Sequence, residues 1–162
     1  VNAYDNSLRF TDAILGELTT LLQAHGGTAA WIYTSDHGED LFDDNRRCFL
    51  HASPVPTYYQ IHVPLWVWLS TDYHTHHATE AEALAAHTEQ PVSTSLSLFH
   101  TLLQLGGLST PVLADSLSLC SPSYHPVPRC YLDDHNRPVP LQELGLTDED
   151  MQQFQRHGLV YE

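Results

Sequence analysis

The spacing of apolar residues divides the first part of the chain into alternating helices and strands. Apolar residues recur near helical spacing over residues 5–24 and 93–106, and a pair of glycines follows each stretch. Residues 29–34 and 63–69 are instead short runs that are almost continuously apolar. Such runs are typical of strands buried on both faces of a parallel sheet. The order helix, strand, loop, strand, helix predicts an α/β fold.

The remaining segments have weaker patterns. Residues 40–61 show no clear period and predict a long loop with a helical turn. The polar, His-rich and Ala-rich residues 71–90 predict a surface loop followed by a helical piece. Residues 110–140 are rich in proline and predict irregular structure with a short strand or hairpin. Residues 147–150 resemble a capping box ahead of a short final helix.

Charge excludes some classes of partner. Six basic residues stand against twenty acidic ones, which gives a formal net charge of −14. Binding a nucleic acid requires clustered Lys and Arg, so we expect no nucleic-acid partner. An acidic surface is also a poor match for anionic lipid headgroups.

Length and apolar runs suggest one domain or part of one. The chain has 162 residues and begins with Val1, without a recognisable signal peptide. Its longest apolar run, residues 63–69, is far shorter than the ~20 residues that cross a bilayer. We therefore expect a piece of a longer protein, of which this stretch is not the membrane-spanning part.

Two arrangements of the cysteines are open. Cys120 and Cys130 flank a Pro-rich loop that a disulfide could close in an oxidising compartment, which would leave Cys48 over. The alternative is three free thiols.

The strongest chemical signal is the segment Ser-Asp-His-Gly-Glu at residues 35–39. It directly follows a predicted strand, and sites of open α/β sheets form beyond the carboxyl ends of strands. Asp36 and His37 offer a carboxylate and an imidazole, both common zinc ligands. Both can reach one ion only if the backbone turns between them, and we expect Gly38 to provide the freedom for that turn. The alternative is a capping Asp and an exposed His in an ordinary loop.

A second histidine group, His74, His76 and His77, has no regular ligand spacing. Its polar flanks favour a solvated loop over a metal-binding module.

The wider context of residues 35–39 resembles a known enzyme family. Ordered blocks are similar to bacterial phosphoethanolamine transferases of the alkaline phosphatase/sulfatase superfamily. The blocks are "YDN…FTD" at residues 4–12, "SDHGE" at 35–39, "LHASP" at 50–54 with Ala52 where Gly is usual, "QIHVPL" at 60–65 and "SLFHTLL" at 97–103. The resemblance fades after residue 110. It implies that residues 1–162 are the C-terminal portion of a single three-layer α/β/α sulfatase-like domain.

The resemblance also implies roles for individual residues. Asp36 and His37 would bind the catalytic zinc, in a site of one or two divalent metal ions. His51 would lie near the transferred phosphoryl group as a catalytic and substrate-binding residue, or help to hold a second metal. Glu39 would orient the loop rather than bind metal. His62 precedes a core strand, and we interpret it as structural.

The family pattern is incomplete in this chain. The family's Thr nucleophile and a further acidic metal ligand come from an earlier part of its sequence, and neither motif is present here. A catalytic zinc site takes three protein ligands and an open position, whereas Asp36 and His37 provide two. We therefore expect that the chain alone binds zinc poorly, is inactive and needs the N-terminal part of the domain.

The reaction implied by the resemblance is transfer of a phosphoethanolamine-type group. The donor would be a phospholipid, the acceptor a lipid A or glycan hydroxyl, and a covalent intermediate would form on the missing Thr. The protein would sit in a bacterial inner membrane with its catalytic domain in the periplasm. Alternatives are a sulfatase, phosphodiesterase or phosphoglycerol transferase on the same fold, and a non-catalytic domain that keeps the fold.

Residues 1–162 should be unstable or require a companion segment when produced alone. The two predicted strands would lack sheet neighbours, and exposed strand edges favour aggregation. A thermal melt with analytical ultracentrifugation checks this. A cooperative transition from a soluble monomer would contradict the prediction.

Overall fold

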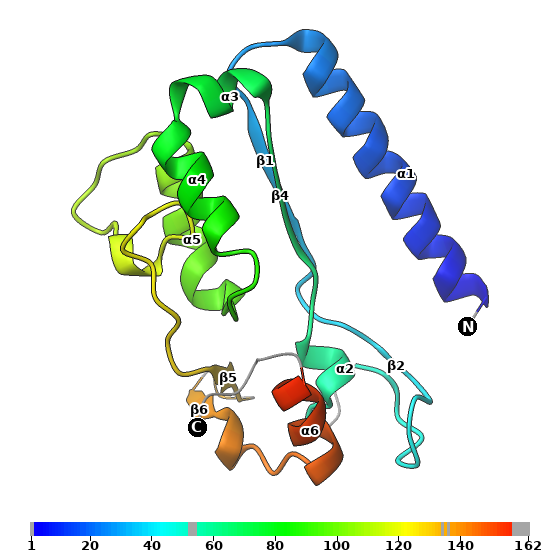
Figure 1. The fold of residues 1–162 in the computed structure, drawn as a ribbon. Coiled ribbons are helices and arrows are strands. Elements are labelled where there is room, and N and C mark those ends of the chain that lie inside the picture. Colours follow the sequence, from blue (N-terminus) through cyan, green and yellow to red (C-terminus); the bar gives the residue numbers. More distant parts are fainter. Residues whose placement is uncertain (1, 52–54, 134, 136, 157–162) are drawn as a thin grey trace.

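A computed structural model describes residues 2–51, 55–133, 135 and 137–156. Figure 1 shows a long two-stranded ribbon with helices on one side, a separate N-terminal helix on the other, and a group of short elements at one end. Helices and sheets are both present, as the α/β prediction requires.

The central ribbon pairs β1 (Ala30–Thr34) with β4 (Leu65–Leu69). The pairing is antiparallel, with Ala30 opposite Leu69 and Thr34 opposite Leu65. The prediction of a parallel sheet buried on both faces was therefore wrong for this pair. Every β1 residue is only partly buried, because the sheet has two strands among the described residues. A continuous apolar run shows that a strand belongs in an interior, but it does not fix the direction of its partner.

The first helix, α1 (Asn2–His25), agrees with the predicted helix over residues 5–24. Gly26 and Gly27 follow it with φ values of 71° and 87°, the left-handed conformation that ends a helix at least cost in glycine. No α1 residue is buried. Its large exposed apolar side chains are Leu8, Phe10, Ile14, Leu18 and Leu21.

Three helices lie on the other side of the ribbon: α3 (Thr71–His76), α4 (Ala78–Ala86) and α5 (Thr94–Leu105). The predicted helix over residues 93–106 corresponds to α5. The surface loop predicted within residues 71–90 was wrong, because α3 and α4 follow each other almost without a break. Ser70 starts α3 by accepting the N–H of Tyr73 on its hydroxyl at 3.0 Å.

The predicted long loop contains more structure than its sequence indicated. Strands β2 (Asp40–Leu41) and β3 (Phe49–Leu50) form a short antiparallel hairpin, and α2 (Tyr58–Ile61) follows. Two-residue strands are too short to show an alternating pattern. Phe42, Arg47 and Leu50 in and beside this hairpin have φ values of 65°, 54° and 64°, which are costly for residues other than glycine.

The Pro-rich segment is largely irregular, as predicted. It contains the 3-10 helix η1 (Asp115–Leu117) and the hairpin strands β5 (Cys130–Leu132) and β6 (Pro138–Pro140), and the 3-10 helix η2 (Leu141–Glu143) follows it.

The last helix, α6 (Asp148–Arg156), begins with the predicted capping box. The Asp150 N–H donates to the Thr147 hydroxyl at 3.2 Å, and the Thr147 N–H donates back to the Asp150 carboxylate at 3.2 Å. Phe154 has no exposed surface and packs edge-on against Tyr58, with ring centroids 5.0 Å apart. α6 therefore packs against α2 at the end of the ribbon (Figure 1).

All three cysteines are free thiols. Cys120 is fully buried, and burial raises its pKa to about 12, whereas Cys130 is exposed on β5. The structure thus has the arrangement of free thiols rather than the Cys120–Cys130 disulfide.

In the part of the chain that the structure describes, no helix combines the length and the apolar character needed to cross a membrane.

Candidate metal centre

Asp36 and His37 lie directly beyond the end of β1. The Asp36 side chain is 88% exposed, and the His37 side chain 37%. The His37 backbone N–H donates to Asp36 Oδ1 at 3.0 Å. This hydrogen bond and the N–H of Asp36 itself hold the pKa of Asp36 below its usual value. The carboxylate is therefore ionised, as a metal ligand must be.

The orientation of the His37 ring suits metal binding through Nε2. Its Nδ1 lies 3.1 Å from the Gly38 carbonyl oxygen, which can only accept a hydrogen bond, so the proton belongs on Nδ1. Nε2 then keeps its lone pair and lies 3.7 Å from Asp36 Oδ2. Two ligands about 2.1 Å from a tetrahedral zinc ion lie about 3.4 Å apart. A shift of a few tenths of an ångström would bring both atoms onto one ion.

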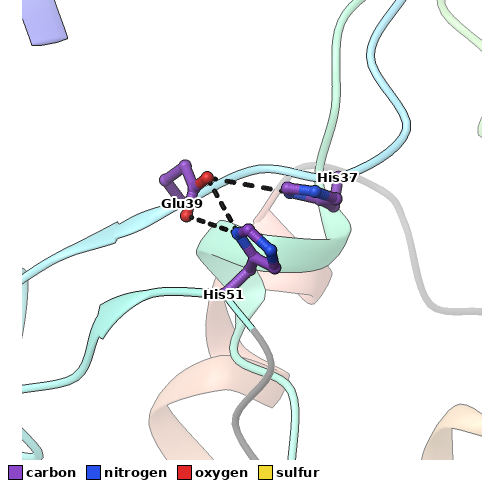
Figure 2. A group of neighbouring side chains, drawn as sticks. All are labelled: His37, Glu39 and His51. Carbon is purple, nitrogen blue, oxygen red and sulfur yellow. Dashed lines mark hydrogen bonds and ion pairs between the residues drawn. The ribbon is translucent and has the colours of Figure 1, made fainter. Parts of the chain in front are cut away.

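Glu39 links the loop to His51. Its carboxylate oxygens lie 3.0 and 3.1 Å from His51 Nδ1, and Oε1 is 3.9 Å from His37 Nδ1 (Figure 2). The two imidazole rings face each other with centroids 3.9 Å apart. His37, Glu39 and His51 can thus each present a ligand atom within 4.8 Å of the others. Sequence reasoning gave Glu39 only a role in orienting the loop, whereas its side chain contacts His51 directly.

The bond to Glu39 has a consequence for His51. With the Nδ1 proton held by a carboxylate, Nε2 is the atom left for a ligand. The His51 side chain is 48% exposed, so that ligand can reach it. Ala52, Ser53 and Pro54 of the same sequence block lie outside the described residues.

Gly38 joins the metal loop to α2. Its N–H donates to the Gln60 carbonyl at 2.8 Å, and a Cβ at this position would lie 2.0 Å from the Tyr59 carbonyl oxygen. Gly38 does not have a positive φ. The prediction that it supplies a special turn was therefore wrong: glycine is required because the α2 backbone comes too close for any side chain.

Asp40 is a second anchor, and sequence reasoning missed it. Only 2% of Asp40 is exposed, and its carboxylate accepts from the Thr57 hydroxyl at 2.7 Å and from the Gln60 side-chain amide. Thr57 is the N-cap of α2. An acidic residue directly after the metal loop gives no sign in the sequence that it is buried, because its partners follow many positions later.

The site opens onto a cavity of about 1190 Å³. Asp36, His37 and His51 line it together with His62 and Arg129. A cavity of this size can hold a substantial organic ligand.

The other histidines singled out from the sequence do not join the group of His37, Glu39 and His51, although His62 and His74 line the same cavity. His62 follows α2 and hydrogen bonds through Nδ1 to the Tyr58 hydroxyl, which fits the interpretation that it is structural. His74 and His76 lie on α3, and His77 stacks on Tyr73 with ring centroids 4.6 Å apart. The loop expected here is therefore a helix, and the structure does not bring these histidines into the group around His37.

Residues 1–108 match the family model described as Sulfatase. The chain belongs to the sulfatase family. This confirms the resemblance seen in the sequence.

The sulfatase-family chain is also similar to named transferases. It is 32% identical over 114 residues to phosphoethanolamine transferase EptA of Salmonella typhimurium and 34% identical to EptA of Escherichia coli K12. Each alignment covers 68% of this chain but 20% of the relative. The chain thus spans about a fifth of the length of these curated relatives.

Solved structures show the same fold. The C-terminal periplasmic domain of EptC from Escherichia coli superposes with a TM-score of 0.66 at 22% identity, covering 91% of this sulfatase-family chain and 41% of that one. The corresponding EptC domain of Campylobacter jejuni gives 0.65 at 30% identity, covering 77% and 39%. One of the E. coli structures is a complex with Zn.

Replacing Gly38 by Ala should destabilise the protein by about 1–3 kcal/mol or more, because the new methyl group meets backbone rather than a flexible side chain. Gly16→Ala is the matched control: it lies in α1 with nothing within 4 Å of the added Cβ, and should be neutral or stabilising by up to ~1 kcal/mol. Thermal unfolding of the full-length variants checks this. Equal melting temperatures for both variants would contradict the close contact.

Proposed function

We propose that this chain is the C-terminal part of the catalytic domain of a zinc-dependent phosphoethanolamine transferase. The observation that carries the proposal is the pairing of Asp36 Oδ2 with His37 Nε2 at 3.7 Å, with the Nδ1 of that imidazole turned to a carbonyl. An ionised carboxylate and a correctly oriented imidazole at the end of a core strand form a metal half-site.

The donor set fits zinc. Carboxylate and imidazole are standard zinc ligands, and the zinc complex of a related periplasmic domain supports the same metal here. Asp36 and His37 would hold the ion, and it would lower the pKa of a nucleophile and neutralise charge on the transferring group. A third protein ligand and the nucleophile, a Thr by family resemblance, would come from the N-terminal part of the same domain.

His51 and Glu39 would serve the substrate. The Glu39 carboxylate accepts the His51 Nδ1–H, with Nδ1 and Oε1 3.0 Å apart, so Nε2 is the ring nitrogen left for a ligand. A neutral Nε2 accepts a proton or a metal ion, whereas a protonated one donates to a phosphate oxygen or to the leaving group. In either state His51 would act on the transferred phosphoryl group or help to hold a second metal ion.

The transfer would proceed in two balanced steps. The Thr hydroxyl gives up its proton as its oxygen attacks phosphorus, the bond from phosphorus to the diacylglycerol oxygen breaks, and that oxygen takes a proton. A lipid A or glycan hydroxyl then gives up its proton as it attacks the same phosphorus, the bond from phosphorus to the Thr oxygen breaks, and the Thr oxygen takes a proton. These residues would work in the periplasm, on a protein anchored in a bacterial inner membrane.

Asp36→Ala and His37→Ala in the full-length protein should each lower the zinc content well below one ion per domain and abolish hydrolysis of a phosphodiester substrate. Removing one ligand from a site that needs three leaves too few for tight binding. Metal analysis by plasma mass spectrometry and a chromogenic phosphodiester assay check this.

His76→Ala on α3 is the matched control and should retain both zinc and activity. Unchanged zinc in Asp36→Ala and His37→Ala would remove the metal assignment. Turnover of a sulfate ester in place of the phosphodiester would favour a sulfatase instead.

A further inference from the structure

The short helix α2 has its position set by its neighbours. It has four residues, too few to be stable on its own in water. Its N-terminus is capped by Thr57 and by Asp150, whose Oδ1 accepts the Tyr58 N–H at 2.9 Å. Its Gln60 carbonyl accepts a hydrogen bond from the N–H of Gly38 in the metal loop. Whatever fixes α2 therefore fixes one side of the candidate metal centre.

Asp150 is a buried charge with a complete set of partners. It is 1% exposed on α6, and its carboxylate lies 2.6 and 2.9 Å from Arg46 Nη1 and Nη2. The Thr147 hydroxyl also donates to it, at 2.8 Å. Burial acts to raise the pKa of Asp150, but the hydrogen bonds from Arg46 and the Tyr58 N–H outweigh it and lower the pKa. The carboxylate is thus ionised and held in one orientation.

Arg46 connects Asp150 to the β2–β3 hairpin. It lies in the loop between β2 and β3, where Asp44 binds the other edge of its guanidinium with Nε–Oδ2 at 2.8 Å. β2 begins directly after Glu39, and β3 ends directly before His51. Both ends of the hairpin therefore carry the two side chains that hydrogen bond to each other.

We propose that Asp150 is a positioning residue for the Glu39–His51 pair. It acts through Arg46 on the β2–β3 hairpin and through the Tyr58 N–H on α2. Asp150 lies outside residues 1–108, the part that matches the family model. The C-terminal segment thus acquires a role in the site without touching it. The effect on turnover rests on the proposed function, whereas the effect on the hairpin does not.

A purely structural Asp150 would behave differently. Loss of a buried ion pair that only stabilises the fold would loosen all parts of the domain together. Loss of a positioning residue instead loosens the hairpin first, and it lowers kcat while Asp36 and His37 keep their zinc.

The test compares Asp150→Asn, Arg46→Lys and Asp150→Glu in the full-length protein. Asp150→Asn keeps the shape but loses the charge, and Arg46→Lys keeps the charge but loses the planar fork. Asp133→Asn is the matched control, because Asp133 forms another Asp–Arg pair, with Arg137, in an exposed turn.

Amide hydrogen exchange measures the local stability of the hairpin without any assay of activity. The Phe42 N–H donates to the Cys48 carbonyl at 3.0 Å within the hairpin, and the Ser70 N–H donates to the Ala29 carbonyl at 2.9 Å beside the ribbon. In Asp150→Asn and Arg46→Lys we expect exchange about tenfold faster at Phe42 and unchanged at Ser70. Asp133→Asn should alter neither.

Steady-state kinetics then test whether the looser hairpin impairs the site. We expect kcat on the phosphodiester to fall about 10- to 100-fold in Asp150→Asn, with zinc content and KM close to wild type, and to recover in part in Asp150→Glu. The double variant of Asp150→Asn with Arg46→Lys should be little worse than the worse single variant, because both act through one contact.

Three results would overturn the inference: unchanged exchange at Phe42, equally faster exchange at Phe42 and Ser70, or a loosened hairpin with unchanged kcat. A wild-type protein without zinc or activity would instead defeat the proposed function, and the exchange data would still decide whether Asp150 holds the hairpin.

Discussion

The candidate site depends on one close contact between two backbones. Gly38 lies against the carbonyls of Tyr59 and Gln60, and it donates its N–H to the second of them. That contact fixes the loop between His37 and Glu39, so both side chains are held by a backbone that cannot shift independently of α2. Because α2 is a single turn, its position is set in turn by two buried carboxylates, Asp40 and Asp150.

In this arrangement the residues that hold the site rigid are not the residues that are exposed to a ligand. Asp40 and Asp150 are almost fully buried with their hydrogen-bonding capacity used, whereas Asp36 and His51 face the cavity. Buried charges without partners are costly, so each inner carboxylate needs its donors in place before the fold is stable. The same chain thus uses its acidic residues for two purposes, and the overall charge of −14 does not distinguish them.

The sequence predicted those features that depend on neighbouring residues. Helix α1, helix α5 and the capping box of Thr147 and Asp150 all follow from local spacing, and all are present. The antiparallel partner of β1 and the contact of Arg46 with Asp150 could not be predicted, because they join positions far apart in the chain. The location of Asp36 and His37 beyond a strand was predictable, but the role of Gly38 was not, since it depends on the carbonyl of Tyr59. The histidine-rich segment 71–90 shows the converse error, in which polar composition concealed helix α3, whereas the helical piece predicted there corresponds to α4.

The left-handed residues of the β2–β3 hairpin have a further consequence. Phe42, Arg47 and Leu50 each hold a backbone conformation that costs a side-chain-bearing residue about 1 kcal/mol or more. The few hydrogen bonds of two-residue strands cannot offset that conformational cost, so contacts with the surrounding structure must offset it. The hairpin backbone is therefore strained, and it would relax away from the site if those contacts were lost. Evolution could in this way adjust how firmly His51 is held without changing any residue that a substrate touches.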